Sequence, residues 1–113
     1  MAVAQHLGEL AKELDAMVKE IGEADHIATV LREEYIRAYA KAWRNSAGSV
    51  ESRKQTALDL TREERMAAET ADCSVRDLRR KIDALKVRID VGRSYGAAVR
   101  AEVELVKSPF GGP

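Results

Sequence analysis

The feature that most limits how this chain can fold is a regular spacing of apolar and small residues through its first third. A seam with alternating intervals of four and three is typical of a coiled-coil helix, because it keeps one stripe facing a partner helix. The spacing predicts a helix over about residues 2 to 44. The seam holds for more than five heptads: Val3, Leu7, Leu10, Leu14, Met17, Ile21, Ala24, Ala28, Leu31, Tyr35, Ala38 and Ala42.

A second long helix is predicted after a short turn. The string NSAGS at residues 45–49 predicts an interruption between two helices. Ser49 is a favourable N-cap for a helix that begins at Val50. We expect this helix to extend over about residues 50–107. The sequence Ser-Pro that follows should end it, and residues 108–113 are expected to form a flexible tail.

The apolar stripe of the second helix is regular only in its C-terminal part. Nearer the turn the best stripe is Ala57, Leu60, Glu64, Ala67 and Ala71, which reaches Val75 by two successive intervals of four. Two such intervals predict a stutter, which locally unwinds a coiled coil. Beyond it the stripe comprises Val75, Leu78, Ile82, Leu85, Ile89, Gly92, Gly96, Val99, Val103 and Val106.

Composition agrees with an all-α fold in one domain. The chain has 113 residues, of which 34% are charged and only 4% aromatic, with two prolines. A short connection makes two long helices antiparallel neighbours, so we predict a long, coiled-coil-like two-helix hairpin. Centring the turn on residues 47 and 48 places Val3 opposite Gly92 and Leu10 opposite Leu85, and leaves the residues after about Arg93 beyond the first helix.

Opposite charges are separated along the neutral chain. Residues 1–34 contain eight acids and three bases, whereas residues 76–107 contain five acids and nine bases. Pairing of the two helices explains this separation most simply, and an external partner is the alternative.

A two-helix hairpin has a thin core, and the segment after about Arg93 lacks a partner in this register. We therefore expect assembly into a dimer or a higher helical bundle. Gly92 and Gly96 occupy seam positions where larger residues usually pack, which favours a close helix crossing in the oligomer over simple tolerance. The predicted oligomer interface comprises Gly92, Gly96, Val99, Val103 and Val106.

Motifs for catalysis or metal binding are weak. Glu23 and His26 have the Glu-x-x-His spacing of carboxylate-bridged di-iron sites, but the heptad places both outside the seam. There is no HExxH, GxSxG or phosphate-binding glycine loop, and Cys73 is interpreted as a small helix residue. We expect a non-enzymatic protein with no cofactor, no metal and no small-molecule substrate.

Near the turn, aromatic side chains alternate with cations. This combination suits single-stranded nucleic acid, because aromatic rings stack on bases while cations neutralise phosphates. The alternative, weighed equally, is that the aromatic residues close the end of the hairpin. The aromatic residues are Tyr35, Tyr39 and Trp43, and the cations are Arg37, Lys41, Arg44, Arg53 and Lys54.

A second basic surface follows one heptad position of the predicted second helix. Such a ridge can follow a phosphate backbone, although positions beside a seam more often form interhelical ion pairs. Arg93, Arg100 and Lys107 are expected to lie beyond the end of the acidic first helix. Ion pairing within the hairpin therefore explains these three cations least well. The ridge comprises Arg79, Lys86, Arg93, Arg100 and Lys107.

The expected compartment is the cytoplasm. Acidic and basic residues interrupt the first fifteen positions, unlike a signal peptide, and no apolar run approaches the roughly 18 residues of a membrane span. A single cysteine cannot form an intrachain disulfide, which is compatible with a reducing environment.

GSVESRK at residues 48–54 and LRRKIDALKVRIDVGRSYGAAVRAEVEL at residues 78–105 carry a resemblance over roughly residues 30–107. In these segments the chain resembles small helical proteins of tailed bacteriophages and prophages, particularly of actinobacteria. The resemblance implies an early-gene product, often encoded near single-strand annealing or recombination functions, and a location in the host cytoplasm. Its closing element corresponds here to Gly92, Ser94, Ala97, Arg100, Ala101 and Glu102.

A second comparison fits less well. Secreted WXG-type proteins share the length, the hairpin and a Trp near the turn, but Trp43 lacks the Gly two residues later and Val99 stands where their export motif has an acid. We therefore expect a phage or prophage accessory protein that associates with single-stranded DNA or a DNA-processing protein. The alternative is a coiled-coil interaction module, such as an adaptor or an inhibitor of a host factor, that binds no nucleic acid.

Overall fold

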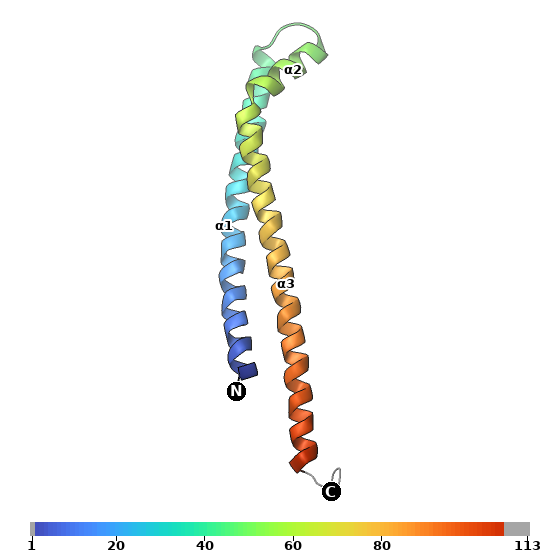
Figure 1. The fold of residues 1–113 in the computed structure, drawn as a ribbon. Coiled ribbons are helices and arrows are strands. Elements are labelled where there is room, and N and C mark those ends of the chain that lie inside the picture. Colours follow the sequence, from blue (N-terminus) through green and yellow to red (C-terminus); the bar gives the residue numbers. More distant parts are fainter. Residues whose placement is uncertain (1, 108–113) are drawn as a thin grey trace. The chain divides into compact units, whose positions relative to one another are not determined.

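Three helices make up the structure, a computed structural model that describes residues 2–107 (Figure 1). In chain order these are α1 (Ala2–Asn45), α2 (Val50–Leu60) and α3 (Arg62–Lys107). No strand occurs among residues 2–107, so the predicted all-α fold is confirmed. The predicted flexible tail at residues 108–113 lies outside the described residues.

The structure divides into two compact units. The open-end unit contains the described residues of 1–18 and 80–113, and the turn unit contains residues 19–79. In each unit α1 lies antiparallel to α3, as a helical hairpin requires. No helix within residues 2–107 combines the length and the apolar character that a membrane span needs.

The predicted seam of α1 is confirmed. Every predicted seam position is buried or half-buried, from Val3 to Ala42. In the open-end unit, Leu10, Leu85 and Ile89 form a buried cluster against which Leu7, Leu14 and Met17 pack. The 3.5-residue periodicity of the sequence therefore predicted the packed face of this helix correctly.

The turn also forms where the sequence predicted it. The Ser49 hydroxyl accepts a hydrogen bond from the backbone N–H of Ser52 at 3.1 Å and so caps the N-terminus of α2. Gly48 has a φ of 105°, a left-handed conformation that favours glycine. Residues 46–49 thus reverse the chain between α1 and α2.

The prediction of one continuous helix over residues 50–107 was wrong at one position. Thr61 separates α2 from α3 with a φ of −114° and a ψ of 21°. Its hydroxyl donates to the Ala57 carbonyl oxygen at 2.6 Å, and its backbone N–H reaches the same oxygen at 3.2 Å. These two hydrogen bonds cap the C-terminus of α2, but the same hydroxyl-to-carbonyl bond occurs inside unbroken helices at Thr29 and Ser74, so it does not by itself cause the break.

The predicted stutter was also wrong. Thr61 is 2% exposed and Ala68 is buried, whereas Leu60 is 67% exposed and Ala67 is exposed. Leucine is more apolar than threonine, and residues 67 and 68 are both alanine, so residue type alone does not identify the buried position at either level. The positions that are actually buried or half-buried keep an uninterrupted 4-3 spacing: Ala57, Thr61, Glu64, Ala68, Ala71, Val75, Leu78, Ile82, Leu85 and Ile89.

The pairing register in the open-end unit differs from the predicted one by one helical turn. A β-carbon built on Gly92 would lie 2.7 Å from Leu7 Cδ2, and one built on Gly96 would lie 3.3 Å from Val3 Cγ1. Val3 therefore lies opposite Gly96 rather than Gly92. The predicted register assumed a tight reversal at residues 47–48, whereas α2 and the break at Thr61 occupy additional residues before α3 begins.

Candidate nucleic-acid interface

The two tyrosines of the turn unit pack on one another. The ring centroids of Tyr35 and Tyr39 are 6.2 Å apart with an interplanar angle of 66°, an edge-to-face pair. Both residues are half-buried, and Tyr35 lies on the α1 seam. This arrangement agrees with the alternative that these aromatic residues close the end of the hairpin.

Trp43 and Arg53 form a second pair. The Arg53 guanidinium carbon lies 5.1 Å from the centroid of the indole ring, within cation–π distance. Arg53 Nη2 also donates a hydrogen bond to the Trp43 carbonyl oxygen at 3.1 Å, which ties α2 to the end of α1. A base could stack on this face of the indole ring only if Arg53 moved away.

The remaining candidate cations of the turn unit are exposed. Arg37, Lys41 and Arg44 follow one another at intervals of four and three on the outer face of α1, and Lys54 lies exposed on α2. Among residues 2–107, no carboxylate oxygen lies within 4.0 Å of these cations. The structure thus gathers three unpaired positive charges along two turns of one helix face.

The basic ridge of α3 is exposed as well. Lys86, Arg93, Arg100 and Lys107 recur every seven residues within the open-end unit, while Arg79 is exposed in the turn unit. In the part of the chain that the structure describes, the ridge cations of the open-end unit have no carboxylate within 4.0 Å. The expected interhelical ion pairs therefore do not neutralise this ridge.

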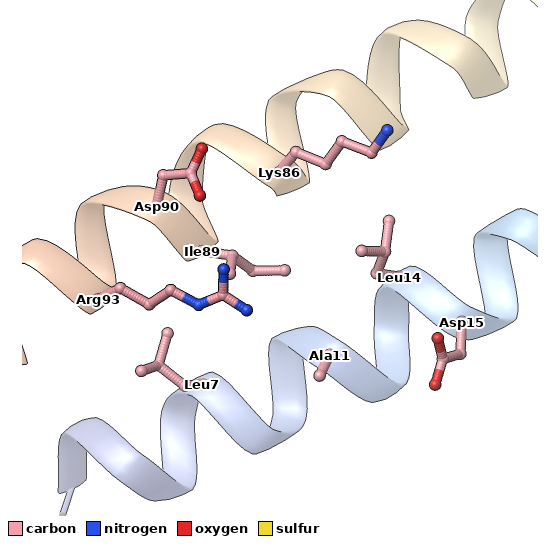
Figure 2. A pocket seen from close by; sticks show the side chains of 8 residues that line it. All are labelled: Leu7, Ala11, Leu14, Asp15, Lys86, Ile89, Asp90 and Arg93. Carbon is pink, nitrogen blue, oxygen red and sulfur yellow. The ribbon is translucent and has the colours of Figure 1, made fainter.

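One ridge residue lies elsewhere than predicted. Arg93 lines a shallow hollow with Leu7, Ala11 and Leu14 of α1, and Figure 2 shows its side chain extended toward α1 near Leu7. Because the register is shifted by one turn, Arg93 lies beside the first helix and not beyond it. Arg100 lines a neighbouring hollow with Val3 and Gly96.

The ion pairs that the structure shows between different helices lie in the turn unit. Arg32 of α1 pairs with Asp72 of α3, and Arg62 lies 3.8 Å from Asp59 across the α2–α3 break. Asp77 and Lys81 also have interaction partners. Most of the acids of residues 1–34 and of the bases of residues 76–107 therefore take no part in the cross-helix ion pairs that the structure shows.

Gly92 and Gly96 lie at a close approach of two helices of the same chain. Gly92 and Gly96 allow α3 to approach Leu7 and Val3 of the same chain. A close crossing thus exists within one chain, and the role of both glycines in an oligomer interface stays a prediction. Val99, Val103 and Val106, the other predicted interface residues, are exposed.

The described residues form no assembled site for metal or thiol chemistry. Within residues 2–107, no group of three or more His, Cys, Asp or Glu side chains could hold a metal ion. Glu23 and His26 are exposed, as the heptad predicted. Cys73 is exposed and accepts a hydrogen bond from Arg76 Nη2 at 3.1 Å.

Comparisons with protein-family models, with curated proteins and with solved structures gave no match. The proposed function below therefore rests on the surfaces of the molecule and on the resemblance described from the sequence. Sequence reasoning also missed one surface, an exposed row on α3 that includes Val91, Tyr95 and Val99. Its signal was present as a four-residue spacing beside the seam.

Proposed function

We propose that this chain is a non-enzymatic accessory protein of the phage or prophage type, located in the host cytoplasm, that associates with nucleic acid. The observation that carries the proposal is the exposure of two unpaired cation groups, Arg37, Lys41 and Arg44 on α1 and the ridge from Lys86 to Lys107 on α3. Cations spaced along a helix and free of carboxylate partners can neutralise successive phosphates of a nucleic-acid backbone.

Backbone contacts are favoured over base stacking. Trp43 is covered on one face by Arg53, and Tyr35 and Tyr39 are half-buried against each other. Binding should accordingly show little sequence preference and a steep salt dependence, because released counterions drive it. Single-stranded DNA, or a recombination or replication protein that carries it, is the partner that the resemblance favours.

The second candidate is a coiled-coil interaction module without nucleic-acid binding, such as an adaptor or an inhibitor of a host factor. The formal net charge of zero and the exposed apolar side chains of α3 support this candidate. An apolar helix-packing contact would weaken little as salt rises, which separates the two candidates experimentally.

The test is a fluorescence-anisotropy titration with labelled single-stranded and double-stranded oligonucleotides at two salt concentrations. Replacement of Arg37, Lys41 and Arg44 by Ala should weaken binding by about tenfold or more at low salt. On single strands, the slope of log affinity against log salt should also fall by about 0.7 for each phosphate that the variant no longer neutralises.

A matched control removes three cations elsewhere. Replacing Lys12, Lys19 and Arg62 by Ala changes the net charge equally, at exposed positions outside both cation groups. This control should bind almost as tightly as the wild type. Absence of binding to either oligonucleotide at low salt would contradict the proposal and favour the interaction module, as would equal losses of affinity in the two triple variants.

A further inference from the structure

A row of exposed side chains on α3 has a spacing that is symmetric about Tyr95. The intervals along the row are four, three, four, four, three and four, so they are the same in either direction from that residue. Each member is exposed, and the large apolar ones are between 37% and 81% exposed. The row comprises Ala84, Arg88, Val91, Tyr95, Val99, Glu102 and Val106.

The residue types also match when the row is read in the opposite direction about Tyr95. Positions at equal distances on the two sides of Tyr95 pair Val91 with Val99, Arg88 with Glu102, and Ala84 with Val106. An apolar residue thus corresponds to an apolar residue, and a cation corresponds to an acid. Two copies of a surface with this property fit each other in an antiparallel, twofold-symmetric contact.

The row is separate from the face that packs on α1. At about 100° per residue, the row is centred about 90° around α3 from the stripe containing Leu85, Ile89 and Gly92. That is roughly the angle between two neighbours of one helix in a four-helix bundle. Tyr95 also lines a shallow hollow with His6 of α1, beside the row. A helix docked on the row can therefore contact both α3 and the edge of α1.

We propose that this row is the contact surface for a second copy of the chain, with the two α3 helices antiparallel and the twofold axis at Tyr95. Tyr95 then packs on Tyr95 of the second copy, and Val91 packs on Val99. Arg88 forms an ion pair with Glu102 on each side of the axis. The contact covers Val99 and Val106 but leaves Gly92 and Gly96 in their contacts with α1.

Charge selects the antiparallel orientation. In a parallel contact, Arg88 would face Arg88 and Glu102 would face Glu102, which places like charges beside an apolar surface. The antiparallel contact replaces both repulsions with attractions. A charged pair within an otherwise apolar seam also specifies register, because a shift of one turn leaves each charge against a valine or alanine.

Charge-reversal variants test the pairing. Arg88→Glu and Glu102→Arg should each raise the dimer dissociation constant by about tenfold or more, measured by sedimentation equilibrium, because both ion pairs become repulsive. The double variant should regain most of the wild-type affinity. Mixing the two single variants should also produce a heterodimer, since each of its two contacts then joins opposite charges.

The matched control is Lys86→Glu. It makes the same change of charge two residues from Arg88, but Lys86 lines the hollow on the other side of the α1–α3 pair. It should leave the dimer dissociation constant within about twofold of the wild type. Far-UV circular dichroism checks that the variants, all at exposed positions, are equally helical.

Disulfide crosslinking tests the orientation separately in a Cys73→Ser background, which removes the exposed natural thiol. Tyr95→Cys should form a crosslinked dimer on mild oxidation. A mixture of Val91→Cys and Val99→Cys chains should crosslink efficiently, whereas Val91→Cys alone should not, since its two copies would lie about 12 Å apart along the axis.

Three results would each overturn the inference. The first is a wild-type monomer at tens of micromolar. The second is a dimer that Arg88→Glu and Glu102→Arg leave unchanged, and the third is efficient crosslinking of Val91→Cys alone, which indicates a parallel contact. None of these results depends on nucleic acid, so failure of this inference can be distinguished from failure of the proposed function.

Discussion

Gly92 and Gly96 control how closely α1 and α3 approach in the open-end unit. The nearest atom to a β-carbon at Gly92 would be Leu7 Cδ2, the end of a flexible side chain, so a small residue there could be tolerated after a rotamer change. A large residue could not, because Leu7 of α1 lies directly against that position. A β-carbon at Gly22, by contrast, would have no such neighbour within 4 Å.

We therefore expect Gly92→Leu to lower the free energy of unfolding by about 1–3 kcal/mol through overpacking. Gly22→Leu should raise it by about 0.5–1 kcal/mol, because glycine is a poor helix former and the site has space. Urea denaturation at one fixed protein concentration measures both. Equal stabilisation by the two substitutions would show that α1 and α3 do not approach closely at Gly92.

The N-cap at Ser49 is a second contribution from a single residue. We expect Ser49→Ala to lower the free energy of unfolding by about 1 kcal/mol, since the Ser52 N–H loses its acceptor at the start of α2. The control is Ser74→Ala, which removes an exposed hydroxyl bonded to the Thr70 carbonyl oxygen within α3. A cost at Ser74 equal to that at Ser49 would contradict a specific capping role.

At the scale of the helices, an ion pair between Arg32 and Asp72 links α1 to α3 in the turn unit. Both side chains are partly exposed, so water and salt screen the pair. Thr61 lies in the same unit and is buried, so α2 and α3 are joined through a packed residue.

Asp72→Asn should lower the free energy of unfolding by about 0.2–1 kcal/mol at low salt, and the difference from wild type should shrink in 1 M sodium chloride. Asp59→Asn is the control, because its partner Arg62 is 3.8 Å away and both side chains are highly exposed. A loss of stability at Asp72 that does not change with salt would indicate a packing role in place of an ionic one.

At the scale of the whole molecule, residues 98–107 of α3 are exposed throughout, while residues 82–96 include the buried positions of the open-end unit. A helical segment without tertiary contacts is marginally stable in water. Association of two copies would therefore determine how firmly the last turns of α3 are held.

We expect amide hydrogen exchange in residues 98–107 to slow as protein concentration rises through the dimer dissociation constant. Residues 82–96 should stay protected at both dilute and concentrated conditions, because α1 covers them within one chain. Arg88→Glu should keep residues 98–107 in fast exchange at all concentrations tested. Protection of residues 98–107 that is independent of concentration would argue against association through this part of α3.

Local patterns in the sequence were sufficient for the all-α fold, the α1 seam and the turn, but not for the division between α2 and α3. A heptad pattern is a local property, and side chains three and four residues apart share a helix face whatever the helix packs against. The exposed cations on α1 and α3 were likewise predictable, because solvent-facing heptad positions follow from the same pattern. Ser49 and Gly48 were recognisable from their capping and turn preferences.

Three features were decided only by the three-dimensional arrangement. They are the break at Thr61, the register of the open-end unit and the partners of the aromatic residues. Each depends on competition between groups distant in sequence or equal in local preference. Thr61 and Leu60 are both acceptable in a helix, and only packing buries the threonine. Arg53 lies on Trp43 because the chain reverses between them, and Gly92 meets Leu7 in a register one helical turn away from the predicted one. Local patterns specify which face of a helix is apolar, whereas the longitudinal position of one helix on another depends on tertiary packing.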